Sequence, residues 1–309
     1  MNKKSKIYIA GHAGLVGSAI VRRLRAGGYT GLICKTHAEL ELLDQKAVQG
    51  FFAKEKPEYV IVAAAKVGGI KANMAHQADF LYENLEIQNN IIWAAHKADV
   101  KKLVFLASSC CYPRESPQPM KEEYVLDGKP EPTNEGYAIA KIAGVKLCEK
   151  ISEQYGQTFV SCMPSNIYGP GDSLDPDHSH VISALFRRMH EAKEKGLNEV
   201  VCWGTGKPRR EFLFVDDLAD AVVWMLESYA DKQFVNIGTG EDVSIKEFAE
   251  LVKKIVGYKG KIVFDTTKPD GMMRKLMDVS LASSKGWKSK TKLEDGLKLF
   301  YEWFKEQKL

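Results

Sequence analysis

Tyr137 and Lys141 in "YAIAK" have a spacing that can support acid–base chemistry. A helix is expected over residues 137–155, and residues four apart in a helix share one face. An ammonium beside a phenol lowers the phenol's pKa from about 10, so the phenol can donate or accept a proton near neutrality. The spacing alone is common. Ser108 gives it weight, because it follows the apolar run 103–107, where a buried strand would deliver a hydroxyl to the carboxyl edge of its sheet.

The segment "FLASSCCYP", residues 105–113, places two thiols directly after that serine. Because side chains alternate along a strand, we expect Ser108 and Cys110 to face the cleft and Ser109 and Cys111 to face away. A partly ionised thiol can act as a base. A free cysteine is more often a small buried core residue, and the residues alone favour neither role for Cys110.

Three glycines, Gly11, Gly14 and Gly17 in "GHAGLVG", stand between an expected strand and an expected helix. Glycines there permit a tight turn, allow the backbone to approach a pyrophosphate, and direct a helix N-terminus at its charge. The spacing is G-x-x-G-x-x-G rather than the usual G-x-G-x-x-G. The position still favours dinucleotide binding over a plain turn.

The tip of the expected second strand is basic. It contains Lys35 and His37, and the first acid is Glu39. NAD sites usually place an acid at this tip, whereas a basic tip suits the extra phosphate of NADPH. We therefore expect NADPH to be the cofactor. The alternative is that these basic residues belong to a solvated loop.

Strands and helices alternate along the first half of the chain, and the strands are apolar throughout. The expected strands are 6–11, 31–35, 58–65, 103–107 and 159–164, and the expected helices are 15–28, 45–56, 78–100 and 137–155. This pattern predicts an α/β fold with a doubly wound parallel (Rossmann) sheet, whose ligands lie beyond the carboxyl ends of the strands. We expect residues 1–168, with a returning strand near 234–240, to bind the dinucleotide. Residues 169–309 should form mainly a smaller, interleaved substrate lobe.

Composition narrows the class of protein. The chain has 309 residues, 45% of them hydrophobic and 27% charged, with a net charge of +4. This favours a globular cytoplasmic protein that binds an anionic small molecule rather than nucleic acid or a membrane. Six cysteines without a C-x-x-C pair, and a histidine pair (His178 and His180) without partners at ligand spacing, predict neither a disulfide framework nor a metal site.

Longer motifs resemble the extended short-chain dehydrogenase/reductases and, within them, the family of GDP-L-fucose synthases (GDP-4-keto-6-deoxy-mannose epimerase/reductases). The resemblance spans nearly the whole chain and includes "AAAKVGGIKAN", "ASSCCYP", "EPTNEGYAIAKIAGVKLCE", "MPSNIYGP", "WGTGKPRREFLFVDDLA" and "KPDGMMRKLMDV". It implies NADPH-dependent 3,5-epimerisation and 4-reduction of GDP-4-keto-6-deoxy-D-mannose to GDP-L-fucose.

The resemblance also implies roles for individual residues. Ser108, Tyr137 and Lys141 would form the reductase triad, and Cys110 and His180 would move protons during epimerisation. The GDP-sugar would contact Arg188, Trp203, Arg210 and Asp270. The cofactor set would be Gly11, Gly14, Leu15, Val16, Gly17, Lys35, His37, Leu106, Ala107, Ser109, Lys141, Pro164, Asn166, Ile167 and His180, with Asn166 and His180 near the nicotinamide.

Three positions depart from the family pattern. Ala13 replaces an arginine in "GHRG", Lys35 stands where arginine is common, and Phe214 replaces the histidine of "FLHVDD". The first two leave a looser cofactor preference possible.

Two rival functions remain at this point. One is another nucleotide-sugar 4-epimerase or 4,6-dehydratase, although a dehydratase would want carboxylates where residues 109–111 stand. The other is a non-catalytic NADP-sensing regulator, which would typically lose the tyrosine or the lysine. A homodimer is expected because the helix after Tyr137 is apolar on several sides, with Ile139, Ile142, Val145, Leu147 and Ile151. The order of the two epimerisations and the pathway of the product are not fixed by the residues.

Overall fold

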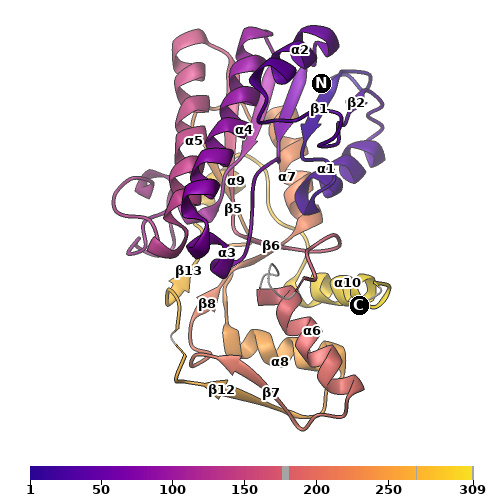
Figure 1. Ribbon diagram of the computed structural model, residues 1–309, viewed down its shortest axis with the longest axis vertical. Coiled ribbons are helices and arrows are strands. Elements are labelled where there is room, and N and C mark those ends of the chain that lie inside the picture. The colour runs from indigo at the N-terminus through magenta and orange to yellow at the C-terminus, as the bar shows by residue number, and fades with distance from the viewer. Residues whose placement is uncertain (176–180, 269, 308–309) are drawn as a thin grey trace.

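A six-stranded parallel sheet forms the larger half of the protein (Figure 1). The computed structural model describes residues 1–175, 181–268 and 270–307. The strand order is β10-β5-β4-β3-β1-β2. These strands are β1 (Ile7–Ala10), β2 (Leu32–Ile33), β3 (Tyr59–Val62), β4 (Lys102–Leu106), β5 (Thr158–Pro164) and β10 (Val235–Ile237). The predicted Rossmann fold is confirmed.

Helices cover both faces of this sheet, which explains why its strands are apolar throughout. One face carries α1 (Leu15–Ala26), α7 (Val215–Ser228) and the short α9 (Ser280–Ser284). The other face carries α2 (Gln45–Glu55), α4 (Gln77–Lys97) and α5 (Glu135–Tyr155). The short α3 (Ile70–Ala75) directly precedes α4. The late elements α7, α9 and β10 therefore complete a half of the molecule that begins at the N-terminus.

The smaller lobe is built from short sheets and three helices below the main sheet in Figure 1. Its strand pairs are β6 (Asn166–Tyr168) with β9 (Phe212–Phe214), and β7 (Glu199–Trp203) with β12 (Lys261–Asp265). A third sheet joins β8 (Arg209–Arg210) to β11 (Val243–Ser244) and β13 (Arg274–Lys275). Its helices α6 (Val181–Glu194), α8 (Ile245–Val256) and α10 (Leu293–Lys305) enclose a separate apolar core.

The junction of β4 and α5 is packed closely. Gly144 lies against the Phe105 ring so tightly that a Cβ at residue 144 would come within 2.5 Å of it. Helix α5 ends at Gly156, whose φ of +73° suits glycine. This close approach, together with the hydrogen bond from Lys141 Nζ to the Leu106 carbonyl oxygen, places the start of α5 at the carboxyl edge of the sheet.

Within the described residues, no helix is long and apolar enough to cross a membrane.

Candidate active site

Lys141 joins the start of α5 to the end of β4. Its Nζ donates a hydrogen bond to the Leu106 carbonyl oxygen at 2.9 Å and lies 5.7 Å from the centre of the Tyr137 ring. Ser108 follows Leu106 by two residues, with an extended backbone. The structure therefore gathers Ser108, Tyr137 and Lys141 at the carboxyl edge of the sheet, as the sequence predicts.

The chain turns directly after Ser108. A 3-10 turn spans Ser109–Cys111, in which the Cys111 N–H donates to the Ser108 carbonyl oxygen at 3.0 Å and the Ser108 Oγ accepts from the Cys110 N–H at 3.4 Å. The expected strand alternation through Cys111 is wrong, because strand geometry ends before these residues. The Cys111 Sγ lies 4.0 Å from the Ala138 carbonyl oxygen, in the apolar core under α5.

The thiol of Cys110 is set apart from an ordinary buried cysteine. The neighbouring Cys111 thiol, the positive charges of Lys275 and Lys141, and the Ser108 hydroxyl lower the pKa of Cys110 to about 7, against the opposing effect of burial. These surroundings favour the ionised form of the thiol. An ionised sulfur at this edge of the sheet can accept a proton from a bound carbon acid.

The acidity of Tyr137 differs from the sequence prediction. Burial, followed by the negative charge of the Cys110 and Cys111 sulfurs, raises the pKa of Tyr137 well above its usual value. Burial also lowers the pKa of Lys141 to about 8, which weakens its effect on the phenol. The expectation of a lowered tyrosine pKa is wrong here, and the phenol is held as a proton donor.

Lys275 is a site residue that the sequence reasoning missed. It pairs in strand register with Arg210, and the next residue, Leu276, is bonded to the segment just after the cysteine turn: its N–H donates to the Gln118 Oε1 at 2.9 Å. Burial, opposed by the charge of Cys110, lowers the pKa of Lys275. Local spacing in the sequence does not predict that Lys275 lies near Cys110, because the two residues are far apart in the chain.

A buried carboxylate fixes the strand that carries Lys275. Glu211, with no exposed surface, accepts hydrogen bonds from the N–H groups of Met277 at 2.8 Å and Gly240 at 2.9 Å. It joins the loop after β10 to the segment after β13, so that Lys275 is held across from Cys110.

The glycine loop forms a cradle in which a dinucleotide fits. A Cβ on Gly11 would lie 2.6 Å from the Ala64 backbone nitrogen, and one on Gly17 would lie 2.0 Å from the Gly11 oxygen. Gly14 caps α1 without a side-chain hydrogen bond, and a Cβ there would meet only the Gly11 oxygen at 3.6 Å. The helix N-terminus, with Leu15 and Val16 in its first turn, is thus open to an anion.

The tip of β2 carries both signs of charge. Lys35 Nζ lies 3.7 Å from Glu39 Oε1, and the other carboxylate oxygen of Glu39 accepts from the Thr36 N–H at 2.8 Å. His37 lies 3.1 Å from Glu41. The tip is therefore less purely basic than the sequence suggests.

Other expected cofactor residues line the same edge of the sheet. Leu106, Ala107 and Ser109 are buried at the end of β4, and Pro164 ends β5. Asn166 is fixed by its Nδ2, which donates to the Glu211 carbonyl oxygen at 2.7 Å, and Ile167 packs against the core under α1 and α7. His180 lies outside the described residues.

The expected substrate residues all lie in the smaller lobe, and two of them, Arg210 and Asp270, interact electrostatically. Asp270 also accepts hydrogen bonds from the Thr205 N–H and hydroxyl at 2.8 and 2.6 Å. Arg188 is exposed and donates to the Val201 carbonyl oxygen at 3.3 Å. Trp203 is 63% exposed, which is unusual for a tryptophan, and the Lys268 Nζ lies 5.8 Å from the centre of its ring.

Phe214, where the family pattern has histidine, is a core residue. It is buried, and its ring centroid lies 5.5 Å from that of Tyr168. This departure affects packing at the junction of the lobes rather than the residues around Cys110.

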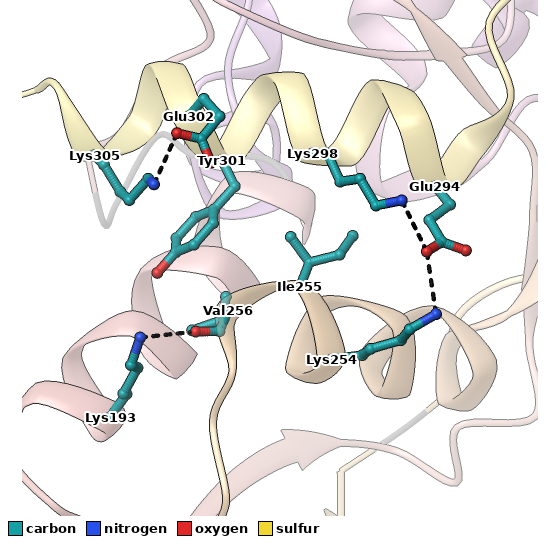
Figure 2. A pocket seen from close by; sticks show the side chains of 9 residues that line it. All are labelled: Lys193, Lys254, Ile255, Val256, Glu294, Lys298, Tyr301, Glu302 and Lys305. Atoms are coloured by element: carbon teal, nitrogen blue, oxygen red, sulfur yellow. Dashed lines mark hydrogen bonds and ion pairs between the residues drawn. The ribbon is translucent and has the colours of Figure 1, made fainter.

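A cavity of about 440 Å³ in the smaller lobe is distinct from this site. Figure 2 shows it between α6, α8 and α10, lined by lysines that are already paired. Glu294 binds Lys254 and Lys298, each at 3.1 Å, and Glu302 binds Lys305 at 2.8 Å. The described residues contain no group of three or more side chains that could hold a metal ion.

Comparisons with a family model, with curated proteins and with solved structures all match most of this chain to enzymes named for nucleotide sugars or to their family. The model of the "NAD dependent epimerase/dehydratase family" matches residues 7–238. GDP-L-fucose synthase 1 of Arabidopsis thaliana is 56% identical over 98% of this chain and 94% of its own length, and GDP-L-fucose synthase of Escherichia coli K12 is 51% identical over 98% and 97%. A solved GDP-mannoheptose C4 reductase of Campylobacter jejuni with NADP bound is 43% identical, with a TM-score of 0.91 over 99% of both chains.

Proposed function

The chain belongs to the NAD dependent epimerase/dehydratase family, and from this premise we propose that it converts GDP-4-keto-6-deoxy-D-mannose to GDP-L-fucose with NADPH. The reaction has two parts: epimerisation at carbons 3 and 5 of the sugar, and reduction of the ketone at carbon 4. The observation that carries the proposal is the Cys110 thiol in the turn directly after Ser108, at the edge of the sheet where Tyr137 and Lys141 also lie. A reductase alone needs no such base, whereas an epimerase does.

The epimerisation half follows from the acidity of the substrate. Protons on carbons 3 and 5 are acidic because each is adjacent to the ketone. The Cys110 thiolate removes one, Ser108 and Tyr137 hold the enolate oxygen, and an acid returns a proton to the opposite face. The family resemblance gives the role of returning acid to His180.

The reduction half uses the same oxygen-binding residues. NADPH, when bound, would supply a hydride for carbon 4, and Tyr137, whose surroundings favour its protonated form, would donate a proton to the developing alkoxide. Lys141 fixes the start of α5 through its bond to Leu106. The cradle of Gly11, Gly14 and the N-terminus of α1 would hold the pyrophosphate of the cofactor.

Recognition of the GDP moiety falls to the smaller lobe. Guanidinium groups present paired donors that match phosphate oxygens, so Arg188 and Arg210 are suited to clamp the diphosphate. Asp270 and the exposed Trp203 would contact the rest of the ligand. The preference for NADPH over NADH rests on Lys35 and His37 at the tip of β2.

A dimer formed by α4 and α5 is part of the proposal. Three of the apolar side chains expected to form it, Ile142, Val145 and Ile151, lie in the core instead. The two helices pack side by side and still expose large side chains: Tyr82, Trp93, Ile139 and Tyr155 are 40–63% exposed. Such a face suits a symmetry mate. Sedimentation of a monomer at micromolar concentration would rule the dimer out.

We also place the enzyme in the cytoplasm, because GDP-sugars and NADPH are multiply charged and do not diffuse through membranes.

A second candidate is a GDP-sugar C4 reductase that does not epimerise, as the name of the Campylobacter neighbour suggests for that protein. The experiment for the main proposal is incubation with GDP-4-keto-6-deoxy-mannose and NADPH, with the reduced cofactor followed by absorbance and the product sugar identified by its NMR couplings. GDP-L-fucose is the expected product. Absence of cofactor oxidation would refute reductase activity, and a product with the original configuration at carbons 3 and 5 would favour the second candidate.

A further inference from the structure

The N-terminus of α5 is capped by a residue from another helix. Asn134 directly precedes α5, and an asparagine at that position normally accepts a hydrogen bond from an N–H group of the first turn. Its side chain makes no such bond. Gln77 of α4 takes its place: the Gly136 N–H donates to the Gln77 Oε1 at 3.0 Å, and the Gln77 Nε2 donates to the Pro132 carbonyl oxygen at 2.9 Å. The amide of Asn134 is therefore not needed to cap the helix.

The Asn134 amide oxygen also lacks any other partner in the protein. This Oδ1 is buried, and among the described residues it has no hydrogen-bond partner. Buried polar atoms are nearly always hydrogen-bonded, because an unpaired one costs free energy. The oxygen can turn toward a ligand without giving up a hydrogen bond, and it would gain one there.

A second unpartnered amide oxygen lies on the adjoining helix. Helix α3 packs against the 3-10 turn Pro132–Asn134. On α3, Asn73 is 7% exposed, and its Nδ2 donates to the carbonyl oxygens of Gly68 at 2.7 Å and Gly69 at 3.1 Å. Its Oδ1 is buried without a partner in the part of the chain that the structure describes. Two such acceptors on adjoining segments indicate a region that a bound ligand completes.

Asn134 lies on the same side of the helix as the proposed proton donor. The spacing of Asn134, Tyr137 and Lys141 is i, i+3 and i+7, which places them on one helical face. Lys141 on this face bonds to the Leu106 carbonyl oxygen at the end of β4, so the face is turned to the carboxyl edge of the sheet. A ketone bound at Tyr137 would bring the substituents of its adjacent carbons next to the residue one turn earlier.

We propose that Asn134 is a specificity-determining residue whose amide hydrogen-bonds the 3-hydroxyl of the bound 4-keto sugar. This role rests on the proposed function, which places the ketone of carbon 4 at Tyr137. Carbon 3 carries the only hydroxyl adjacent to that ketone, because carbon 5 bears the methyl group and the ring oxygen. A site that hydrogen-bonds a hydroxyl discriminates against a substrate that lacks it. Asn134 therefore favours 3-hydroxylated over 3-deoxy sugars.

The test compares kcat/KM for GDP-4-keto-6-deoxy-mannose with kcat/KM for its 3-deoxy analogue, GDP-4-keto-3,6-dideoxy-mannose, both followed by NADPH oxidation. Asn134→Ala and Asn134→Leu remove the amide, and leucine keeps a side chain of similar size. Each variant should lower kcat/KM about tenfold or more for the hydroxylated sugar but less than about twofold for the analogue. The inhibition constant of the analogue as a competitor gives the same comparison when its turnover is slow.

A neighbouring residue and the melting temperature provide the controls. Glu135→Ala, exposed and one residue along, should leave both kcat/KM values unchanged. Because Gln77 provides the cap, both Asn134 variants should melt within about 2 °C of the wild type.

The outcomes also separate the role of Asn134 from the proposed function. Equal losses on the two sugars, as a destabilised helix start would give, or no loss on either, would overturn the role of Asn134 and leave the proposed function in place. No turnover of GDP-4-keto-6-deoxy-mannose by the wild type would instead refute the proposed function, and the role of Asn134 with it.

Discussion

Lys275 on β13 interacts electrostatically with Cys110 on the turn after β4, so a residue of the smaller lobe supplies charge to the catalytic edge of the main sheet. The ammonium favours the ionised form of the thiol, and the thiolate in turn favours the protonated lysine. Glu211 holds the lysine strand in place through the Met277 N–H. The base of the proposed epimerisation therefore depends on contact between the two lobes.

Replacing Lys275 with methionine should raise the pKa of Cys110, because the cation that favours its thiolate is lost. The pH at which solvent exchange of the sugar protons reaches half its maximum should move upward from about 7, by on the order of one unit. Exchange in heavy water measured across pH 6–9 gives this profile. The exposed Lys259→Met is the control, and an identical profile for wild type and Lys275→Met would contradict the role of the charge.

Cys110→Ser and Tyr137→Phe should fail in different ways. A serine hydroxyl does not ionise near neutrality, so Cys110→Ser should nearly abolish exchange of the sugar protons. Tyr137→Phe lacks the proton source for the alkoxide, so net reduction should collapse while some exchange survives. Mass spectrometry of recovered substrate separates the two half-reactions. Equal loss of both activities in both variants would refute the division of roles.

Because the tip of β2 carries both signs of charge, substitutions there should change the preference between NADPH and NADH. Glu39→Gln removes a carboxylate 3.7 Å from Lys35, so the KM for NADPH should fall while that for NADH changes little. Lys35→Asp should do the reverse and raise the KM for NADPH more than that for NADH. Steady-state kinetics with both cofactors checks this, and equal effects on the two would place the extra phosphate elsewhere.

Two glycines of the cradle should separate folding from cofactor binding. Gly17→Ala would bring a Cβ within 2.0 Å of the Gly11 oxygen, which forces the turn apart and should lower the melting temperature. Gly14→Ala has room within the protein but places a methyl group where the pyrophosphate approaches. It should weaken NADPH binding with little change in melting temperature. Isothermal titration calorimetry measures NADPH binding, and differential scanning calorimetry measures the melting temperature. Equal melting temperatures of the two variants would disprove the distinction.

The sequence predicts the sheet well, and it brings Tyr137 and Lys141 together, because both depend on local pattern. Apolar strands between amphipathic helices define the Rossmann half, and Tyr137 and Lys141 lie one helical turn apart whatever surrounds them. The expected continuation of the strand to Cys111 is wrong, because a turn stabilised by Ser108 replaces the strand at that point. The acidity of Tyr137 was mispredicted for a different reason: burial depends on tertiary packing, which spacing does not report.

Lys275 illustrates what long-range contact adds. Its neighbours in "MMRKLMDV" carry no sign of catalysis, and only the pairing of β13 with β8 brings it beside Arg210 and near Cys110. Such residues are found from the fold rather than from motifs.

The central claim, that one site both epimerises and reduces, is tested most directly by running the reaction with GDP-4-keto-6-deoxy-mannose and NADPH in heavy water. The account predicts a 4-reduced product that carries solvent deuterium at both carbon 3 and carbon 5. A reduced product without deuterium at either carbon would contradict it, because Cys110 would then not act as a base on this substrate.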